Sequence, residues 1–316
     1  MKRTRLRVAL LCLLLPGAGC VTFDRQTVVA VFPPDGKEVR ALLVYEGLRV
    51  HGDRDEDLKA AKDQLRRMPG SRSEFCLGSP ALHVNLTQER QGDAVLNTCK
   101  GQVARHLVVR GGAFFETKEG GLCAYQTVTV RDPAGFVRDV NEATSALLLP
   151  ELATRLADPS RREAFWDEEM LRRFVLASTN RYAWWELEPG RVRFNVPADS
   201  AAAVRLKRAL LRPDVFAEAR KLPEPADGLR FLGRVGPVLA DNAWSLDQRP
   251  DRLALALGFG EGRPLRLVVQ TEPPSPYRPL DRQLVDYAKT LKAPFQTEQT
   301  VEALVQDFIR KNGVLK

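Results

Sequence analysis

Residues 122–131 read LCAYQTVTVR, and this segment indicates most clearly how the chain folds. Its side chains alternate between an apolar set and a mixed set, which are Leu122, Ala124, Val128 and Val130 on one side and Cys123, Tyr125, Thr127 and Thr129 on the other. Because successive side chains of a strand point to opposite faces of a sheet, this period of two predicts a strand with two different faces.

Similar strand patterns lie on both sides of this segment, and helical patterns separate them. We predict further strands at 28–32, 39–50, 81–87, 103–109, 113–117, 182–188, 191–196, 229–239, 243–247, 252–258 and 264–271. Apolar residues at three- and four-residue steps predict helices at 55–68, 142–178 with a break at 158–159, 199–211, 214–221, 280–292 and 298–311.

The order of these elements predicts an α+β fold. Both halves of the chain run as two strands, a helix, about four strands and closing helices. We therefore predict two similar α+β domains with mostly antiparallel sheets, at 28–178 and 179–316. The sheets would be separate, with the helices of 142–178 between them and a groove of the kind that binds small ligands. One continuous sheet is the alternative.

The start of the chain has the features of an export signal. Residues 1–7 contain four basic residues and no acid, and the apolar run from Val8 to Leu15 is eight residues long. A membrane-spanning helix needs about twenty apolar residues, so this run is too short to span a bilayer. A basic start followed by a short apolar core and small residues is typical of a removable secretory signal, which we place at residues 1–19.

Ala18, Gly19 and Cys20 close this segment, after a glycine at position 17. This stretch resembles the lipobox of bacterial prolipoproteins, in which Leu is usual at the position of Gly17. The resemblance implies that Cys20 is the lipid-bearing first residue of the mature protein, with acyl chains such as palmitate. We therefore predict a membrane-anchored lipoprotein of the bacterial cell envelope that faces the periplasm, with residues 20–27 as a polar tether. Ordinary secretion with an unmodified Cys20 is the alternative.

Composition narrows the possible partners. Of the net charge of +8, four charges lie in residues 1–19, which leaves +4 on the remaining chain. Acidic and basic residues are interspersed along it, and we therefore expect no nucleic-acid partner. With 44% apolar residues the chain can form a substantial core. The membrane, through the lipid, and an envelope protein or a glycan are the partners we predict.

Three cysteines remain after Cys20, and two of them belong to a repeated pattern. Cys76, Gly78 and His83 share the spacing Cys-x-Gly-x4-His with Cys99, Gly101 and His106. In an oxidising envelope we predict a Cys76–Cys99 disulfide, which leaves Cys123 free. A zinc site is the weaker alternative, because zinc ligand pairs are usually two to five residues apart. We predict neither a metal nor a cofactor.

Catalytic signatures are absent from the sequence. A glycine-rich stretch at 258–262 is followed by a strand pattern, whereas a dinucleotide-binding loop requires a helix there, so we predict a hairpin turn. No nucleophile motif is present, and we name no catalytic residue. Trp184 and Trp185 are the best candidates for binding, because adjacent strand residues point to opposite faces and one ring should be exposed. We therefore predict a binding or structural module, with an envelope hydrolase acting on cell wall or glycan as the alternative.

Overall fold

The computed structural model describes residues 21–50, 55–76, 83–87, 93–158, 168–210, 242–260, 263–270, 279–291, 293–297 and 299–312. Within these residues helices and mostly antiparallel sheets are mixed, which confirms the predicted α+β class. The predicted signal at 1–19, Cys20, the helix near 214–221 and the strand near 229–239 lie outside the described residues. None of the helices in the described ranges is long and apolar enough to cross a membrane.

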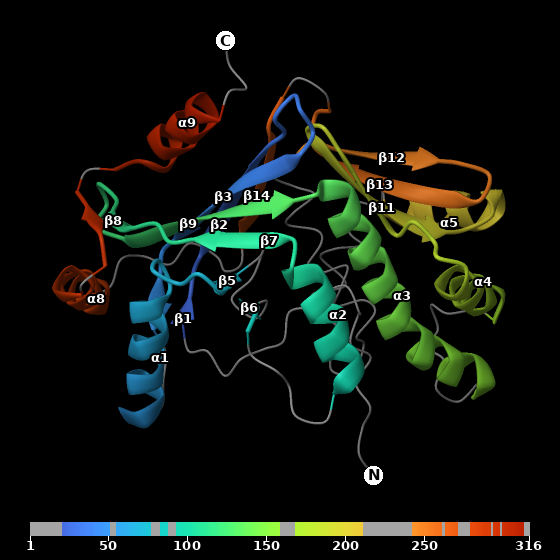
Figure 1. The fold of residues 1–316 in the computed structure, drawn as a ribbon, viewed down its shortest axis with the longest axis horizontal. Helices are drawn as coiled ribbons and strands as arrows, with labels where there is room; N and C mark the ends of the chain where they lie inside the picture. The colour runs from blue at the N-terminus through green and yellow to red at the C-terminus, as the bar shows by residue number, and fades with distance from the viewer. Residues whose placement is uncertain are drawn as a thin grey trace.

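A seven-stranded sheet forms the centre of the molecule (Figure 1). Six strands follow the order β14-β2-β3-β9-β8-β15, and β7 also pairs with β9. Their bounds are β2 (Arg25–Val31), β3 (Glu38–Glu46), β7 (Leu107–Arg110), β8 (Phe114–Glu116), β9 (Leu122–Arg131), β14 (Leu265–Gln270) and β15 (Phe295–Gln296). All pairs are antiparallel except β15 with β8. The bounds of β9 agree with the strand predicted from its alternation.

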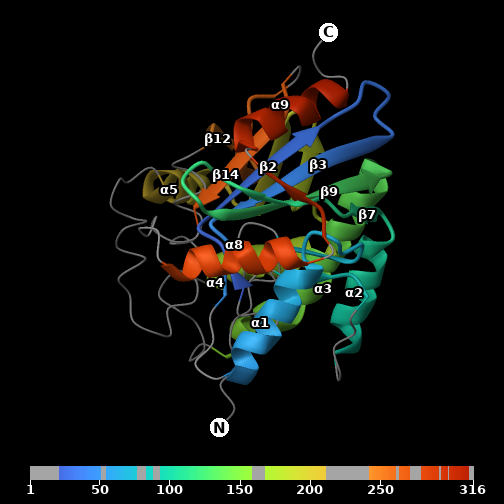
Figure 2. The ribbon, with the colours of Figure 1, turned by 90° about the vertical axis from the view of Figure 1, so that its left-hand side faces the viewer.

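Helices cover both faces of this sheet (Figures 1 and 2). On one side, which we call the α1 face, lie α1 (Asp55–Arg67), α8 (Pro279–Thr290) and the hairpin of β5 (Glu74–Cys76) and β6 (His83–Asn85). On the other side, the α9 face, lies α9 (Val301–Lys311). Alternation along β3 sends Leu43 and Tyr45 to the α1 face and Leu42 and Val44 to the α9 face. The sheet is therefore apolar on both faces.

A second, four-stranded sheet lies beside the first, with the order β10-β11-β13-β12. It consists of β10 (Trp185–Glu188), β11 (Arg191–Pro197), β12 (Trp244–Gln248) and β13 (Arg252–Leu257). It packs against α4 (Glu168–Thr179) and α5 (Ser200–Leu210). The long helix α3 (Pro133–Ala157) contacts both β9 and β10 and lies between the two sheets, as predicted for this helical region (Figure 1).

The predicted separation of the strands into first-half and second-half sheets is wrong. Strand β14 comes from the second half, yet it pairs antiparallel with β2 from Leu265 opposite Ala30 to Gln270 opposite Arg25. β15 likewise joins the first-half sheet, beside β8. The physical reason is that β2 offers β14 an unpaired edge, and Leu265 then joins an apolar cluster with Ala30 and Val39. The two sheets exist, but the chain crosses between them, and a boundary between folding units at residue 179 stays a prediction.

The glycine-rich stretch after β13 makes this crossing. It was predicted to be a hairpin turn, but β13 and β14 belong to different sheets, so it is a connection between sheets. Gly258 and Gly260 have φ values of +103° and +93°, which side chains with a Cβ rarely adopt. A Cβ on Gly258 would lie 2.2 Å from the Gly190 carbonyl oxygen. Gly258 is thus required by its positive φ and by the close approach of its backbone to the β10–β11 turn, whereas Gly260 is required by its positive φ.

Two further local predictions need correction. The predicted strand at 103–109 begins too early, because α2 (Ala94–Ala104) occupies the first part and β7 follows. The predicted tether at 20–27 is part of the fold from residue 21 onward, since β1 (Val21–Thr22) pairs with β4 (Arg49–Val50) and β2 starts at Arg25. Alternating apolar side chains explain this second correction: Val21 and Phe23 are only 4% and 1% exposed.

Candidate functional site

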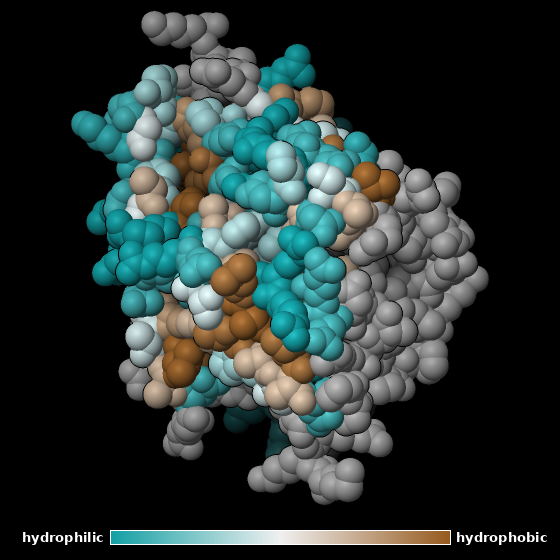
Figure 3. Space-filling view, turned by 90° about the vertical axis from the view of Figure 1, so that its right-hand side faces the viewer, coloured by the Kyte–Doolittle hydropathy of each residue, from teal (hydrophilic) through white to brown (hydrophobic). Residues whose placement is uncertain are grey.

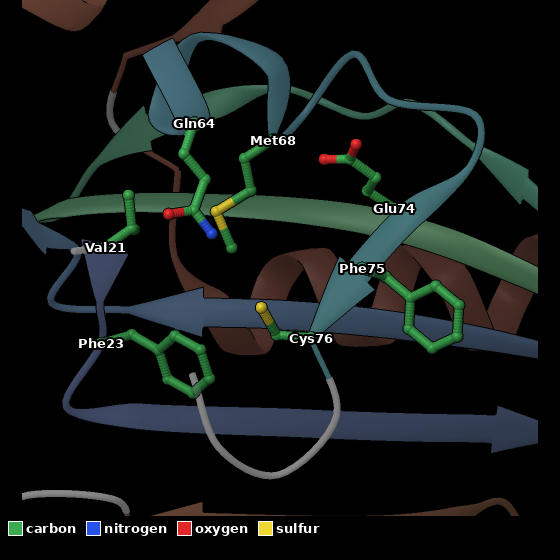
Figure 4. Close-up of a pocket in the computed structure, with 7 residues that line it drawn as sticks. All are labelled: Val21, Phe23, Gln64, Met68, Glu74, Phe75 and Cys76. Carbon is green, nitrogen blue, oxygen red and sulfur yellow. The ribbon is translucent and has the colours of Figure 1, made fainter. Parts of the chain in front are cut away.

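A small pocket lies at the N-terminal end of the described chain, on the α1 face (Figure 4). Three segments line it, namely Val21 and Phe23, Gln64 and Met68 of α1, and Glu74, Phe75 and Cys76 of β5. The side chains of Met68 and Cys76 point toward each other across it (Figure 4). We call it the N-terminal pocket. Its free space is that of about one water molecule, so it is too small for an organic ligand.

A buried hydrogen-bond network holds β5 beneath the sheet and so forms one wall of this pocket. Gln26 Nε2 donates to the Cys76 carbonyl at 2.8 Å, and the Cys76 N–H donates to the Tyr45 hydroxyl at 3.2 Å. Tyr45 Oη lies 3.1 Å from Gln126 Oε1, and Gln126 Nε2 donates to the Glu74 carbonyl at 3.0 Å. Gln26, Tyr45 and Gln126 are fully buried. Buried polar groups need such partners, so the network fixes one position of β5.

The three cysteines of the described chain are free, buried thiols. The predicted Cys76–Cys99 disulfide is therefore not formed in this structure. The two side chains belong to different apolar clusters, Cys76 with α1 and the sheet, and Cys99 with α2 and α3. Burial raises the pKa of Cys76 and of Cys123 to about 12, and burial also raises the pKa of Cys99. Since the thiolate is the reactive form, these thiols are unreactive at neutral pH.

The repeated Cys-x-Gly-x4-His pattern forms two unrelated structures. Cys76 and His83 lie opposite each other on the antiparallel strands β5 and β6. Cys99 lies within α2, and His106 follows the end of that helix. Over the described part of the chain, no three His, Cys, Asp or Glu residues come together as a possible metal site. The pattern therefore has two different roles in the fold.

The second copy nevertheless contributes to a partly buried cluster of ionisable groups, which we call the His106 cluster: Arg105, His106 and Asp139. His106 Nε2 lies 2.9 Å from Asp139 Oδ2, and the same oxygen accepts from Arg105 at 2.6 Å. Asp139 is 2% exposed and His106 is 7% exposed. Burial raises the pKa of Asp139, but the hydrogen bonds from His106 and Arg105 outweigh it, and the pKa lies below its ordinary value.

The start of α3 brings these groups together. Asp132 has a φ of +49°, caps the helix, and accepts from the Gly135 N–H at 3.1 Å. A Cβ on Gly135 would lie 2.9 Å from His106 Cε1, so the glycine allows the imidazole to pack against the helix. Asp139 follows one turn later and meets the ring. An imidazole held by a carboxylate supplies two of the three members of a hydrolytic triad, but no described hydroxyl or thiol bonds to His106.

Trp184 and Trp185 have different environments. Trp184 is fully buried, packs against Phe174, and donates from its indole nitrogen to Ser145 Oγ at 2.8 Å. It is a core residue that joins α3 to the second sheet, so of the two tryptophans it is the one that does not reach the surface. Trp185 is half-buried against Phe194, and its indole Nε1 is buried with no hydrogen-bond partner. Its backbone N–H donates to Asn141 of α3 at 2.7 Å. Trp185 is the one of the pair that retains accessible surface.

The surface near the second sheet is mixed in character. Viewed from this side, separate hydrophobic patches are interrupted by hydrophilic residues (Figure 3). Among the charged residues here, Arg252 of β13 lies 3.3 Å from Glu186 and 3.1 Å from Asp251. Arg193 of β11 is paired with Glu186 and Glu188. The charges on this sheet are thus largely neutralised by their neighbours.

Sequence reasoning named Cys20, Cys76, Cys99, Trp184 and Trp185 but missed the groups that the fold brings together. Tyr45 and Gln126 lie in predicted strands without a special role, Gln26 lies in the predicted tether, and Asp139 lies 33 positions from His106. Only polar residues at inward positions of strand patterns could have indicated the network. Comparison of this chain with protein-family models, with curated proteins and with solved structures finds no match, so its function has to be argued from its own residues.

Proposed function

We propose that this protein is a lipid-anchored component of the bacterial cell envelope, attached to the membrane through Cys20 and acting as a binding or structural module. The observation that carries the proposal is the position of Val21. This residue follows Cys20 directly, pairs with Val50 and is 4% exposed. Val21, the residue after the predicted lipidation point, is thus already part of the folded body.

A binding or structural role is supported by how the potentially reactive groups are used. The carboxylate of Asp139 is held by His106 and Arg105 in contacts that tie α2 to α3. The buried thiols are protonated at neutral pH, and the N-terminal pocket has room for about one water. These groups stabilise the fold. Trp185, which keeps exposed surface, is the residue we assign to contact with an envelope protein or a glycan.

The anchor is tested by replacing Cys20. The parent protein, purified from bacterial membranes, is expected to partition into detergent and to carry the mass of a diacylglycerol with further acyl chains, because two or more chains anchor a protein firmly. Cys20→Ser is expected to be left unprocessed or to be soluble. Cys12→Ser is the matched control, since Cys12 lies in the predicted signal and should leave the mature protein unchanged. An intact mass with an unmodified Cys20 would refute the proposal.

An envelope hydrolase is the second candidate, and the His106–Asp139 pair is the observation that favours it. A carboxylate bonded to an imidazole orients the ring for proton transfer. The test is release of soluble fragments from purified cell wall by the parent and by His106→Gln. Release by the parent that disappears in His106→Gln, with the fold intact by circular dichroism, would favour the hydrolase over the binding module. No release from either protein is the expected result.

A further inference from the structure

The connection between the proposed lipid and the folded body contains no free linker. Consecutive Cα atoms lie about 3.8 Å apart across a trans peptide, so Cys20 lies within one residue of the buried Val21. Val21 and Phe23 belong to the large apolar cluster, and Val21 also pairs with Val50 of β4. A lipid on Cys20 would therefore join the body one residue from a fixed point, the buried and paired Val21, and this short connection limits how far the body can turn.

This attachment point lies on one particular side of the central sheet. The cluster that contains Val21 includes Leu65 of α1, Phe75 of β5 and Val285 of α8. The opposite face packs against α9, through Leu304, Val305 and Ile309. In Figure 2 α9 lies above the sheet, and α8 and α1 lie below it. The fixed point is thus on the α1 face, with the full thickness of the sheet between it and α9.

We infer that the α1 face is a membrane-docking surface that rests against the phospholipid headgroups, while α9 is held away from the membrane. This inference rests on the proposed function, because it requires the lipid on Cys20. The orientation comes from covalent attachment and not from charge, since α1 contains four acidic and four basic residues. It should therefore form equally on neutral phosphatidylcholine. One consequence is that α9 and its surroundings remain open toward the periplasm.

Two exposed alanines allow a matched test. Ala60 lies on α1 and Ala303 lies on α9, and both side chains are exposed. Each is changed to cysteine in the full acylated chain, labelled with a fluorophore, and reconstituted in phosphatidylcholine vesicles containing a lipid with a nitroxide headgroup. The native thiols Cys76, Cys99 and Cys123 are buried and should label poorly. Flotation of the vesicles measures anchoring, and quenching by the nitroxide measures orientation.

The label at Ala60→Cys is expected to be quenched at least about twofold more than the label at Ala303→Cys, because a sheet with a helix on each side separates them by about 20 Å. Inserting twenty Gly and Ser residues between Cys20 and Val21 should remove this difference, since such a linker spans about 25 Å. Equal quenching without the insertion, or stronger quenching at Ala303→Cys, in vesicles that float with the protein would overturn the orientation alone. Protein that fails to float would overturn both the anchor and the orientation.

Discussion

The two sheets differ in how completely their strands are buried. In β2 every residue from Gln26 to Val31 is buried, because helices cover both faces of the seven-stranded sheet. In β11 only Asn195 and Pro197 are buried, and the apolar side chains Val192, Phe194 and Val196 are half-buried. A strand covered on both faces contributes to stability along its whole length. A partly covered strand leaves side-chain surface accessible, and a binding partner can contact it.

This difference assigns separate roles to the two regions. The seven-stranded sheet packs with Val21 and contains the network around Tyr45, so it stabilises the N-terminal end of the described chain, next to which we propose the lipid anchor. The four-stranded sheet carries Trp185 and the paired charges of Arg193 and Arg252 at half-buried positions, which keep some accessible surface. Stability should therefore respond most strongly to changes in the first region, and partner binding to changes in the second. Four sets of variants test the first half of this statement.

The largest effect is expected from a leucine pair. Leu43 is 2% exposed in β3, and Leu43→Ala should lower the free energy of unfolding by about 2–5 kcal/mol through lost apolar contact and a cavity. Leu255 of β13 is half-buried, and Leu255→Ala should cost roughly 1–2 kcal/mol. Urea unfolding followed by circular dichroism measures both. Equal costs would contradict the comparison, and a separate transition for the four-stranded sheet would support a boundary near residue 179.

Asp139→Ala should lower the free energy of unfolding by about 3 kcal/mol at pH 7, because it removes the partner of His106 and Arg105. The pKa of Asp139 is lowered in the fold, so its contribution is complete above the unfolded value of about 4 and is lost as the pH falls through the folded value.

The cost of Asp139→Ala should therefore shrink in acid, as pH-dependent urea unfolding can measure. Asp63→Ala, at an exposed position of α1, is the control and should have little effect at any pH. A cost for Asp139→Ala that grows as the pH falls would show that the carboxylate does not stabilise the fold.

A pair of tyrosines tests the network. Tyr45→Phe should cost about 1–3 kcal/mol, because it leaves the Cys76 N–H and Gln126 Oε1 buried without their partner. Tyr125 is only half-buried and its hydroxyl accepts from Gln296 at 3.3 Å, so Tyr125→Phe should cost less than about 1 kcal/mol. Thermal unfolding of both variants measures the difference. A neutral Tyr45→Phe would mean that the Tyr45 hydroxyl does not contribute to holding β5.

The smallest effect is expected on the four-stranded sheet. Arg252 is paired with Glu186 and Asp251 at a partly exposed position, and Arg252→Gln should cost at most about 1 kcal/mol. That cost should diminish in about 1 M NaCl, where the screening length is about 3 Å, whereas the cost of Leu43→Ala should persist. A salt-independent loss for Arg252→Gln would indicate that packing over Tyr182, 5.7 Å from the guanidinium, is the main contribution.

The local periodicity of apolar residues predicted most of the described helices and strands, and the element that it missed has an identifiable cause. The alternation at 122–131 and the periodicity of α1 depend only on neighbouring residues, and both elements occur where expected. Helix α2 was not predicted, because Gly101 lowers the helix propensity of this segment. Its buried residues Leu96, Cys99 and Val103 nevertheless recur at three- and four-residue steps, as in a helix. Asp93, which accepts from the Leu96 N–H, and packing against α3 compensate for that glycine.

By itself, the sequence determined the helices and strands and the predicted export signal. An apolar period of two, or a short apolar run after basic residues, depends only on residues that are close together in the chain. The tertiary structure decided which strands pair, which thiols lie apart and which polar groups meet. Strand β14 reaches β2 from more than 230 positions away, and His106 meets Asp139 only because Gly135 lets the ring approach α3. Such partners are selected by close packing and by the need to satisfy buried hydrogen bonds. Neither requirement can be read from the residues of a short segment.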